Sequence, residues 1–169
     1  MDEIARRAGI SVPVVYDHFP SKLALYRHLL EQDFGDLASI WTGQLASEGS
    51  AQQRFRGAMD AWFAHIERRA FTPRLLFRVT TADPGVRVVQ QEIIAKTKQL
   101  LIPLVAGNLL DISDSTAAGQ PIELDLVFEI LSGAVQALSL WWSQHPDTPR
   151  EFIVDTALDT LWTGLERRR

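Results

Sequence analysis

Four histidines are the residues of this chain most able to bind a metal or move a proton. His18, His28, His65 and His145 are scattered along the sequence, without the short spacings that bring metal ligands together. The chain contains no cysteine, which excludes disulfides and thiolate metal sites. We also find no glycine-rich phosphate loop and no motif of an activated nucleophile. We therefore expect a protein that is not an enzyme and that holds no metal and no cofactor.

The composition indicates a globular protein with a substantial core, because 46% of its 169 residues are hydrophobic. The net charge of −4 argues against a protein that covers nucleic acid unspecifically with lysine and arginine. Charges balance within residues 1–32, so the acidic remainder is not expected to touch DNA. The first residues resemble no signal peptide, and charges interrupt the long apolar stretches. We expect a cytoplasmic protein with no membrane partner.

A sharp turn between two short helices is the most informative local pattern. Asp2 to Ala8 form a helical stretch, and Gly9 supplies the left-handed residue that ends it. Ser11 can cap a second helix, in which Val15 and Phe19 share the inward face. This spacing predicts a helix-turn-helix.

The segment IARRAGISVPVVYDHFPSKLAL resembles the recognition segment of the TetR family, in which an Ala-Gly turn precedes a Tyr-x-x-Phe recognition helix. The resemblance covers about residues 2–30. It implies an all-α protein in which a long helix links the helix-turn-helix to a C-terminal bundle. Residues 1–32 would be the DNA-binding head, and residues 33–169 the ligand-binding and dimerisation domain. Relatives carry a further helix before the one at Asp2, so we expect a truncated head.

The resemblance also implies which residues contact DNA. Tyr16 and Lys22 would bind phosphates, with Lys22 at the N-terminus of the long helix, where backbone amides attract anions. Pro13 or Val14 would contact a thymine methyl group, and Asp17 is a candidate acceptor for a hydrogen bond from cytosine. The alternative for Tyr16 is a place in the core. The predicted DNA-binding residues are Ser11, Val12, Pro13, Val14, Tyr16, Asp17, His18 and Lys22.

Helix-capping patterns divide the rest of the chain. A capping residue followed by proline occurs at Thr72, Asp83 and Thr148, and Ser50 with Gln53 forms a capping box. These signals predict helices near 51–69, 73–81, 84–106, 121–144 and 149–167, and no strand. A long helix starting at Ser21 is predicted by one apolar stripe, which consists of Tyr26, Leu30, Phe34, Leu37, Trp41 and Leu45.

The helix over 121–144 has only a narrow polar stripe, so it must bury two apolar faces. One face would pack in its own core, and the other would join the last helix in a four-helix interface between two copies. The alternative is a large core within a monomer. The residues predicted for the dimer interface are Val127, Leu131, Leu138, Val154, Leu158, Leu161 and Leu165.

Helical bundles place ligand sites in apolar cavities between facing helices. Aromatic and aliphatic residues are available for such a cavity, and the alternative for each is an ordinary core position. His65 is a candidate polar anchor. The predicted ligand-binding residues are Trp41, Met59, Trp62, Phe63, Ile66, Phe77, Leu101, Phe128 and Trp141.

These expectations combine into one function. The chain would be a ligand-responsive transcriptional regulator, most simply a repressor, that binds double-stranded operator DNA as a homodimer. An apolar or weakly polar small molecule would release it by shifting the population of head placements. The alternative is a dimeric helical ligand-binding or adaptor protein that has lost DNA binding.

Overall fold

A computed structural model describes residues 1–77, 83–109 and 120–166, and all the regular elements in these ranges are α-helices, as predicted. Where both ends are described, the predicted bounds agree with the structure to within two residues; the predicted ends at 81 and 167 lie outside the described residues. The helices are α1 (Asp2–Ala8), α2 (Val12–His18), α3 (Lys22–Leu45), α4 (Ala51–Arg68), α5 (Thr72–Phe77), α6 (Pro84–Asn108), α7 (Gln120–Trp142) and α8 (Arg150–Glu166).

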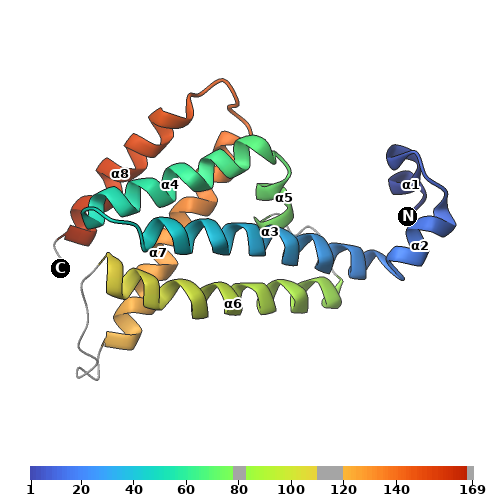
Figure 1. The fold of residues 1–169 in the computed structure, drawn as a ribbon, viewed down its shortest axis with the longest axis horizontal. Coiled ribbons are helices and arrows are strands. Elements are labelled where there is room, and N and C mark those ends of the chain that lie inside the picture. The colour runs from blue at the N-terminus through green and yellow to red at the C-terminus, as the bar shows by residue number, and fades with distance from the viewer. Residues whose placement is uncertain (78–82, 110–119, 167–169) are drawn as a thin grey trace.

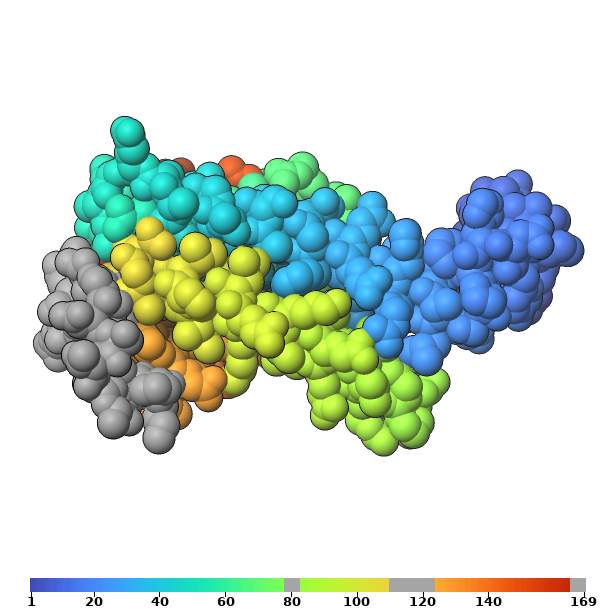
Figure 2. All heavy atoms as spheres, turned by 60° about the horizontal axis from the view of Figure 1, so that its bottom comes forward, coloured from blue at the N-terminus to red at the C-terminus, as the bar shows by residue number. Residues whose placement is uncertain are grey.

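The long helix α3 organises the molecule. It runs along much of the length of the protein, with α1 and α2 at its N-terminal end, α6 beside most of its length, and α4, α7 and α8 around its second half (Figure 1). Helix α6 lies along one side of α3, α4 packs on the other side, and α8 covers α4 (Figure 1). In the space-filling view the first two helices project as a separate lobe (Figure 2). The expected domain boundary after residue 32 falls inside α3, so the two parts share one continuous helix.

Side-chain caps fix several helix starts. Ser21 Oγ accepts from the Ala24 amide at 3.0 Å, and Ser50 and Gln53 form the predicted capping box. Asp83 accepts from the Gly85 amide at 2.8 Å. Two predicted caps are wrong: Ser11 makes no capping hydrogen bond, and the Thr72 hydroxyl is buried without a hydrogen-bond partner.

Buried side chains form separate cores at the two ends of the molecule. Met1, Ala5 and Val15 make a small core in the α1–α2 lobe. A much larger core fills the space between the second half of α3, α4, α7 and α8. The small lobe is joined to α3 by the contact of Phe19 with His28, whose ring centroids are 5.3 Å apart. The rigid connection between the two cores is therefore α3 itself.

Candidate functional site

The turn between α1 and α2 has the geometry that the sequence predicts. Gly9 adopts φ 68° and ψ 26°, a left-handed conformation that favours glycine. The Gly9 amide donates to the carbonyl of Arg6, and the Ile10 amide donates to the carbonyl of Ala5. This pair of hydrogen bonds is a Schellman motif, which reverses the chain directly into α2.

Helix α2 buries one face and presents the other to solvent. Val15 is buried and Phe19 packs against the same small core. Tyr16 is 49% exposed, so the alternative of a core position for this residue is wrong. Val12 is half-buried against the lobe's core, which leaves it less surface for a base contact than its neighbours. The other seven residues predicted to contact DNA are exposed: Ser11, Pro13, Val14, Tyr16, Asp17, His18 and Lys22.

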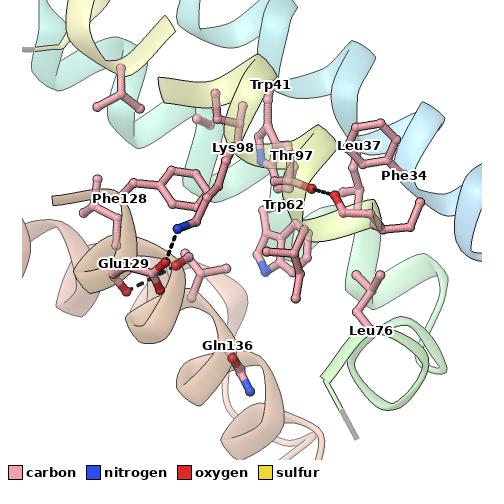
Figure 3. A pocket seen from close by; sticks show the side chains of 18 of the residues that line it. Phe34, Leu37, Trp41, Trp62, Leu76, Thr97, Lys98, Phe128, Glu129 and Gln136 are labelled. Carbon is pink, nitrogen blue, oxygen red and sulfur yellow. Dashed lines mark hydrogen bonds and ion pairs between the residues drawn. The ribbon is translucent and has the colours of Figure 1, made fainter. Parts of the chain in front are cut away.

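A cavity of about 510 Å³ lies among α3, α4, α5, α6 and α7. Its volume falls within the range of small-molecule sites in proteins. One wall is formed by Trp41 of α3 and Trp62 of α4, which stack with centroids 5.2 Å apart (Figure 3). The Trp62 indole donates to Ser139 Oγ at 2.9 Å, so its polar atom is satisfied within the core. The wall therefore presents flat apolar surface to a ligand.

Most of the residues predicted to bind the ligand lie at this cavity. Six of the nine line it, namely Trp41, Met59, Trp62, Phe77, Leu101 and Phe128. Phe63 and Ile66 do not line it and are buried in the main core. Trp141 is 45% exposed and stacks on His145, away from the cavity. For these three the cavity prediction is wrong, because helical spacing indicates a shared face without showing what that face packs against.

His65 is not a ligand anchor either, because a buried carboxylate binds it. Its Nε2 lies 3.0 Å from Oδ1 of Asp33, and both side chains are almost fully buried between α3 and α4. The same Asp33 oxygen accepts from Arg69 at 3.2 Å. This cluster is a polar link within the core and does not line the cavity.

Helix α6 contributes more residues to the cavity than the predicted Leu101. Gln90, Ile94, Thr97 and Lys98 all line it. They follow one another at spacings of four, three and one, so three successive turns of α6 face the ligand space. The available signal was that Lys98 has the apolar residues Ile94, Leu101 and Ile102 three or four positions away on the same helix.

A hydrogen-bonded chain connects the cavity lining to the start of α3. Gln90 Nε2 donates to the Tyr26 hydroxyl at 3.0 Å, and that hydroxyl donates to the carbonyl of Leu75 at 3.2 Å. Burial raises the pKa of Tyr26, so the phenol remains a donor. Three helices, α3, α5 and α6, thus meet at one hydroxyl group.

Helix α6 also holds α3 close to the small lobe. Arg27 of α3 pairs with Glu92 of α6, which holds the pKa of Glu92 below its usual value. A Cβ atom at Gly85 would lie 2.7 Å from a Leu23 methyl group, so glycine allows the N-terminus of α6 to approach α3 closely. Helix α6 therefore both lines the cavity and contacts the N-terminal part of α3.

Comparison with known proteins identifies the N-terminal lobe. Residues 1–29 match the family described as bacterial regulatory proteins, tetR family. The match spans α1, α2 and the first turns of α3, so this N-terminal segment is of the TetR type. A curated relative, the HTH-type transcriptional activator FasR of Mycolicibacterium smegmatis (strain ATCC 700084 / mc(2)155), is 44% identical over 77 residues. The aligned part is 46% of this chain and 35% of the length of that relative.

Two solved structures share the fold of this protein over nearly its whole length. The fatty acid degradation regulator FadR from Bacillus halodurans matches with a TM-score of 0.78 and 14% identity, covering 95% of this chain and 82% of that one. The regulator FadR from Bacillus subtilis, solved in complex with stearoyl-CoA, matches with a TM-score of 0.75 and 13% identity, covering 95% and 85%. These likenesses establish the fold.

The residues expected at the dimer interface lie mainly in the protein's own core. Val127, Val154 and Leu158 are buried, and Leu131, Leu138 and Leu161 are partly buried against the same core. The side chain of Leu165 lies outside the described residues. Large apolar side chains on the outer faces are instead Leu126, Ile130 and Trp141 of α7 and Phe152 of α8, which are 45–64% exposed. Helices α7 and α8, which were expected to form the dimer interface, do have an exposed apolar face. The residues predicted for that interface instead point into the core.

Proposed function

We propose that this TetR-family protein is a ligand-responsive transcriptional regulator that binds operator DNA through α1 and α2. The observation that carries the proposal is the course of α3. Its first residue, Lys22, is exposed beside the predicted recognition helix, and its later turns, from Leu30 to Leu45, line the cavity. A ligand that displaces the cavity wall therefore acts on the same helix that positions the DNA-facing lobe. Residues 1–32 would serve as the DNA-binding head and residues 33–169 as the ligand-binding and dimerisation domain.

We infer that the effector carries a long apolar chain. Nineteen of the 25 described residues that line the cavity have apolar side chains, which suits a ligand with few polar groups. The structural neighbour from Bacillus subtilis was solved with stearoyl-CoA, a thioester with an eighteen-carbon acyl chain. A long-chain acyl compound is the effector class that both observations support.

The exposed apolar face of α7 supports a homodimer. Phe128 lines the cavity. Leu126 and Ile130 are each two residues from Phe128, a rotation of about 200°, so they lie on the opposite face of α7. The segment Leu124–Trp142 has a mean hydropathy of 1.4 and only 17% of it is buried, so by length and composition alone it could cross a membrane. We assign this face to a second copy because α7 also carries Asp125 and Glu129, which pair with Lys98. The cytoplasm, where operator DNA is found, remains the predicted location.

The proposed mechanism is a shift between two placements of the DNA-binding heads. In a dimer, the heads must match two half-sites about one helical turn of DNA apart, roughly 34–36 Å. Ligand binding would favour a placement that misses this spacing and would lower DNA affinity. Release from an operator that blocks a promoter relieves repression. The relative from Mycolicibacterium smegmatis is named an activator, and release from an activating site would have the opposite effect on transcription.

The DNA-binding part of the proposal is tested by fluorescence polarisation with a duplex taken from directly upstream of the gene. We expect Tyr16→Phe with Lys22→Ala to weaken binding to this duplex and to a scrambled one by a similar factor. The salt slope should fall by about 1, because one phosphate contact is lost with its charge. The control is Lys96→Ala at an exposed position on α6, which also removes one positive charge. It should change neither the affinity for DNA nor the salt slope.

Wild-type binding that is weak, steeply salt-dependent and indifferent to sequence would contradict this function. That outcome would favour the second candidate, a dimeric ligand-binding or adaptor protein without an operator.

A further inference from the structure

The mouth of the cavity lies between α6 and α7. Ile94 lines the cavity although its side chain is 56% exposed, and Lys98 follows it one turn later on α6. On α7 the cavity is lined by Glu129 and by Gln136, which are both exposed. A side chain that borders both the cavity and solvent marks an opening. Figure 3 shows Lys98 reaching from α6 across this opening to Glu129.

One cluster of charges closes the mouth. Lys98 Nζ lies 2.9 Å from Oδ1 of Asp125 and also pairs with Glu129, so one ammonium group holds two carboxylates of α7. The same nitrogen lies 5.8 Å from the ring centroid of Phe128. The two carboxylates hold the pKa of Lys98 above its usual value, so the amine stays protonated.

The charges at the cavity restrict what can enter it. Among the described residues that line the cavity, Lys98 is the only cationic side chain and Glu129 the only carboxylate. Their charges cancel, and Asp125 gives the cluster at the mouth a net negative charge. An anionic headgroup is therefore repelled unless it takes the place of the carboxylates at Lys98. The exchange costs little, because Asp125 and Glu129 are about half exposed and such ion pairs are weak.

We propose that Lys98 is a gate residue that exchanges the carboxylates of Asp125 and Glu129 for the anionic headgroup of a long-chain ligand. The headgroup stays at the mouth, and the apolar chain extends inward toward Trp41 and Trp62. The exchange removes the ion pairs between α6 and α7. The negative charge of the ligand therefore acts on α6, the helix that also pairs with α3 through Glu92. This inference rests on the proposed long-chain effector and adds the requirement for a negative headgroup.

The test compares two probes that differ only in charge: an eighteen-carbon conjugated-polyene carboxylate, whose fluorescence rises in an apolar cavity, and its methyl ester. We expect Lys98→Met to weaken carboxylate binding at least tenfold and to leave ester binding within twofold. Asp125→Asn with Glu129→Gln should strengthen carboxylate binding at least threefold, because Lys98 is then unpaired. Lys96→Met, an exposed lysine on the same helix, is the matched control and should alter neither affinity.

The outcomes separate the gate from the function on which it rests. If both probes bind the wild-type protein and Lys98→Met weakens them equally or not at all, the gate is wrong and the long-chain effector stands. If carboxylate affinity falls in the double variant, the gate is also wrong. If neither probe binds the wild-type protein, the proposed effector class is wrong, and the gate with it.

Discussion

At the scale of single residues, the least expected feature is the charged cluster buried between α3 and α4. Asp33 is fully buried, and one of its oxygens contacts both His65 and Arg69 while the other has no hydrogen-bond partner. Burying a carboxylate costs free energy that only its partners offset. The cluster fixes the register of α3 against α4 at a turn of α3 whose neighbouring residues Leu30 and Phe34 line the cavity.

We predict that Asp33→Asn lowers the free energy of unfolding by about 3 kcal/mol, because it leaves His65 and Arg69 facing an uncharged group in the core. Urea denaturation followed by circular dichroism measures the change. Asp36→Asn is the control, because Asp36 pairs with the same Arg69 at 2.8 Å but is 45% exposed. We expect it to lower the free energy of unfolding by only about 0.5 kcal/mol. Equal effects of the two substitutions would show that burial of Asp33 is not what makes the cluster important.

Some single residues could be placed from the sequence alone, and others could not. The positions of Gly9, Val15 and Tyr16 could be predicted because a tight turn and a two-turn helix leave few choices. His65 could not be assigned, because its partner Asp33 lies 32 residues away on another helix. A side chain's pattern along its own helix does not indicate what the neighbouring helix places opposite it.

At the scale of elements, α7 was the helix most open to misinterpretation. Its sequence is apolar nearly all round, so periodicity predicted two buried faces but did not distinguish the inner from the outer one. The structure places Val127 inside and Leu126 and Ile130 outside. The caps and lengths of α4 and α6 were easier to predict, because their starting residues act locally through Ser50 and Asp83.

The outer face of α7 makes a prediction about assembly. We expect Leu126→Glu with Ile130→Glu to halve the molar mass measured by light scattering without loss of helix content, because both side chains are about 60% exposed. Glu substitutions at the exposed Gln91 and Gln99 of α6 are the control and should leave the mass unchanged. Val154→Glu should unfold the chain instead, since Val154 is 1% exposed. A double variant that keeps the wild-type mass would place the interface on another surface.

At the scale of the whole molecule, the two candidate sites are connected by two parallel helices. Helix α3 carries the DNA-facing lobe at one end and cavity-lining residues at the other, and α6 follows it for much of that length (Figure 1). Tyr26 joins the two helices through Gln90, a residue of the cavity lining. A ligand that moves Gln90 therefore acts on α3 only a few residues after the predicted recognition helix.

Coupling between the sites is the central claim, and a thermodynamic cycle tests it most directly. Stearoyl-CoA should lower the affinity for operator DNA by about tenfold, and DNA should lower the affinity for stearoyl-CoA by the same factor, because coupling is reciprocal. Tyr26→Phe should bind both partners but reduce this factor, since it removes the hydroxyl that links Gln90 to Leu75. If both partners bind the wild-type protein and neither changes the affinity for the other, the account is contradicted.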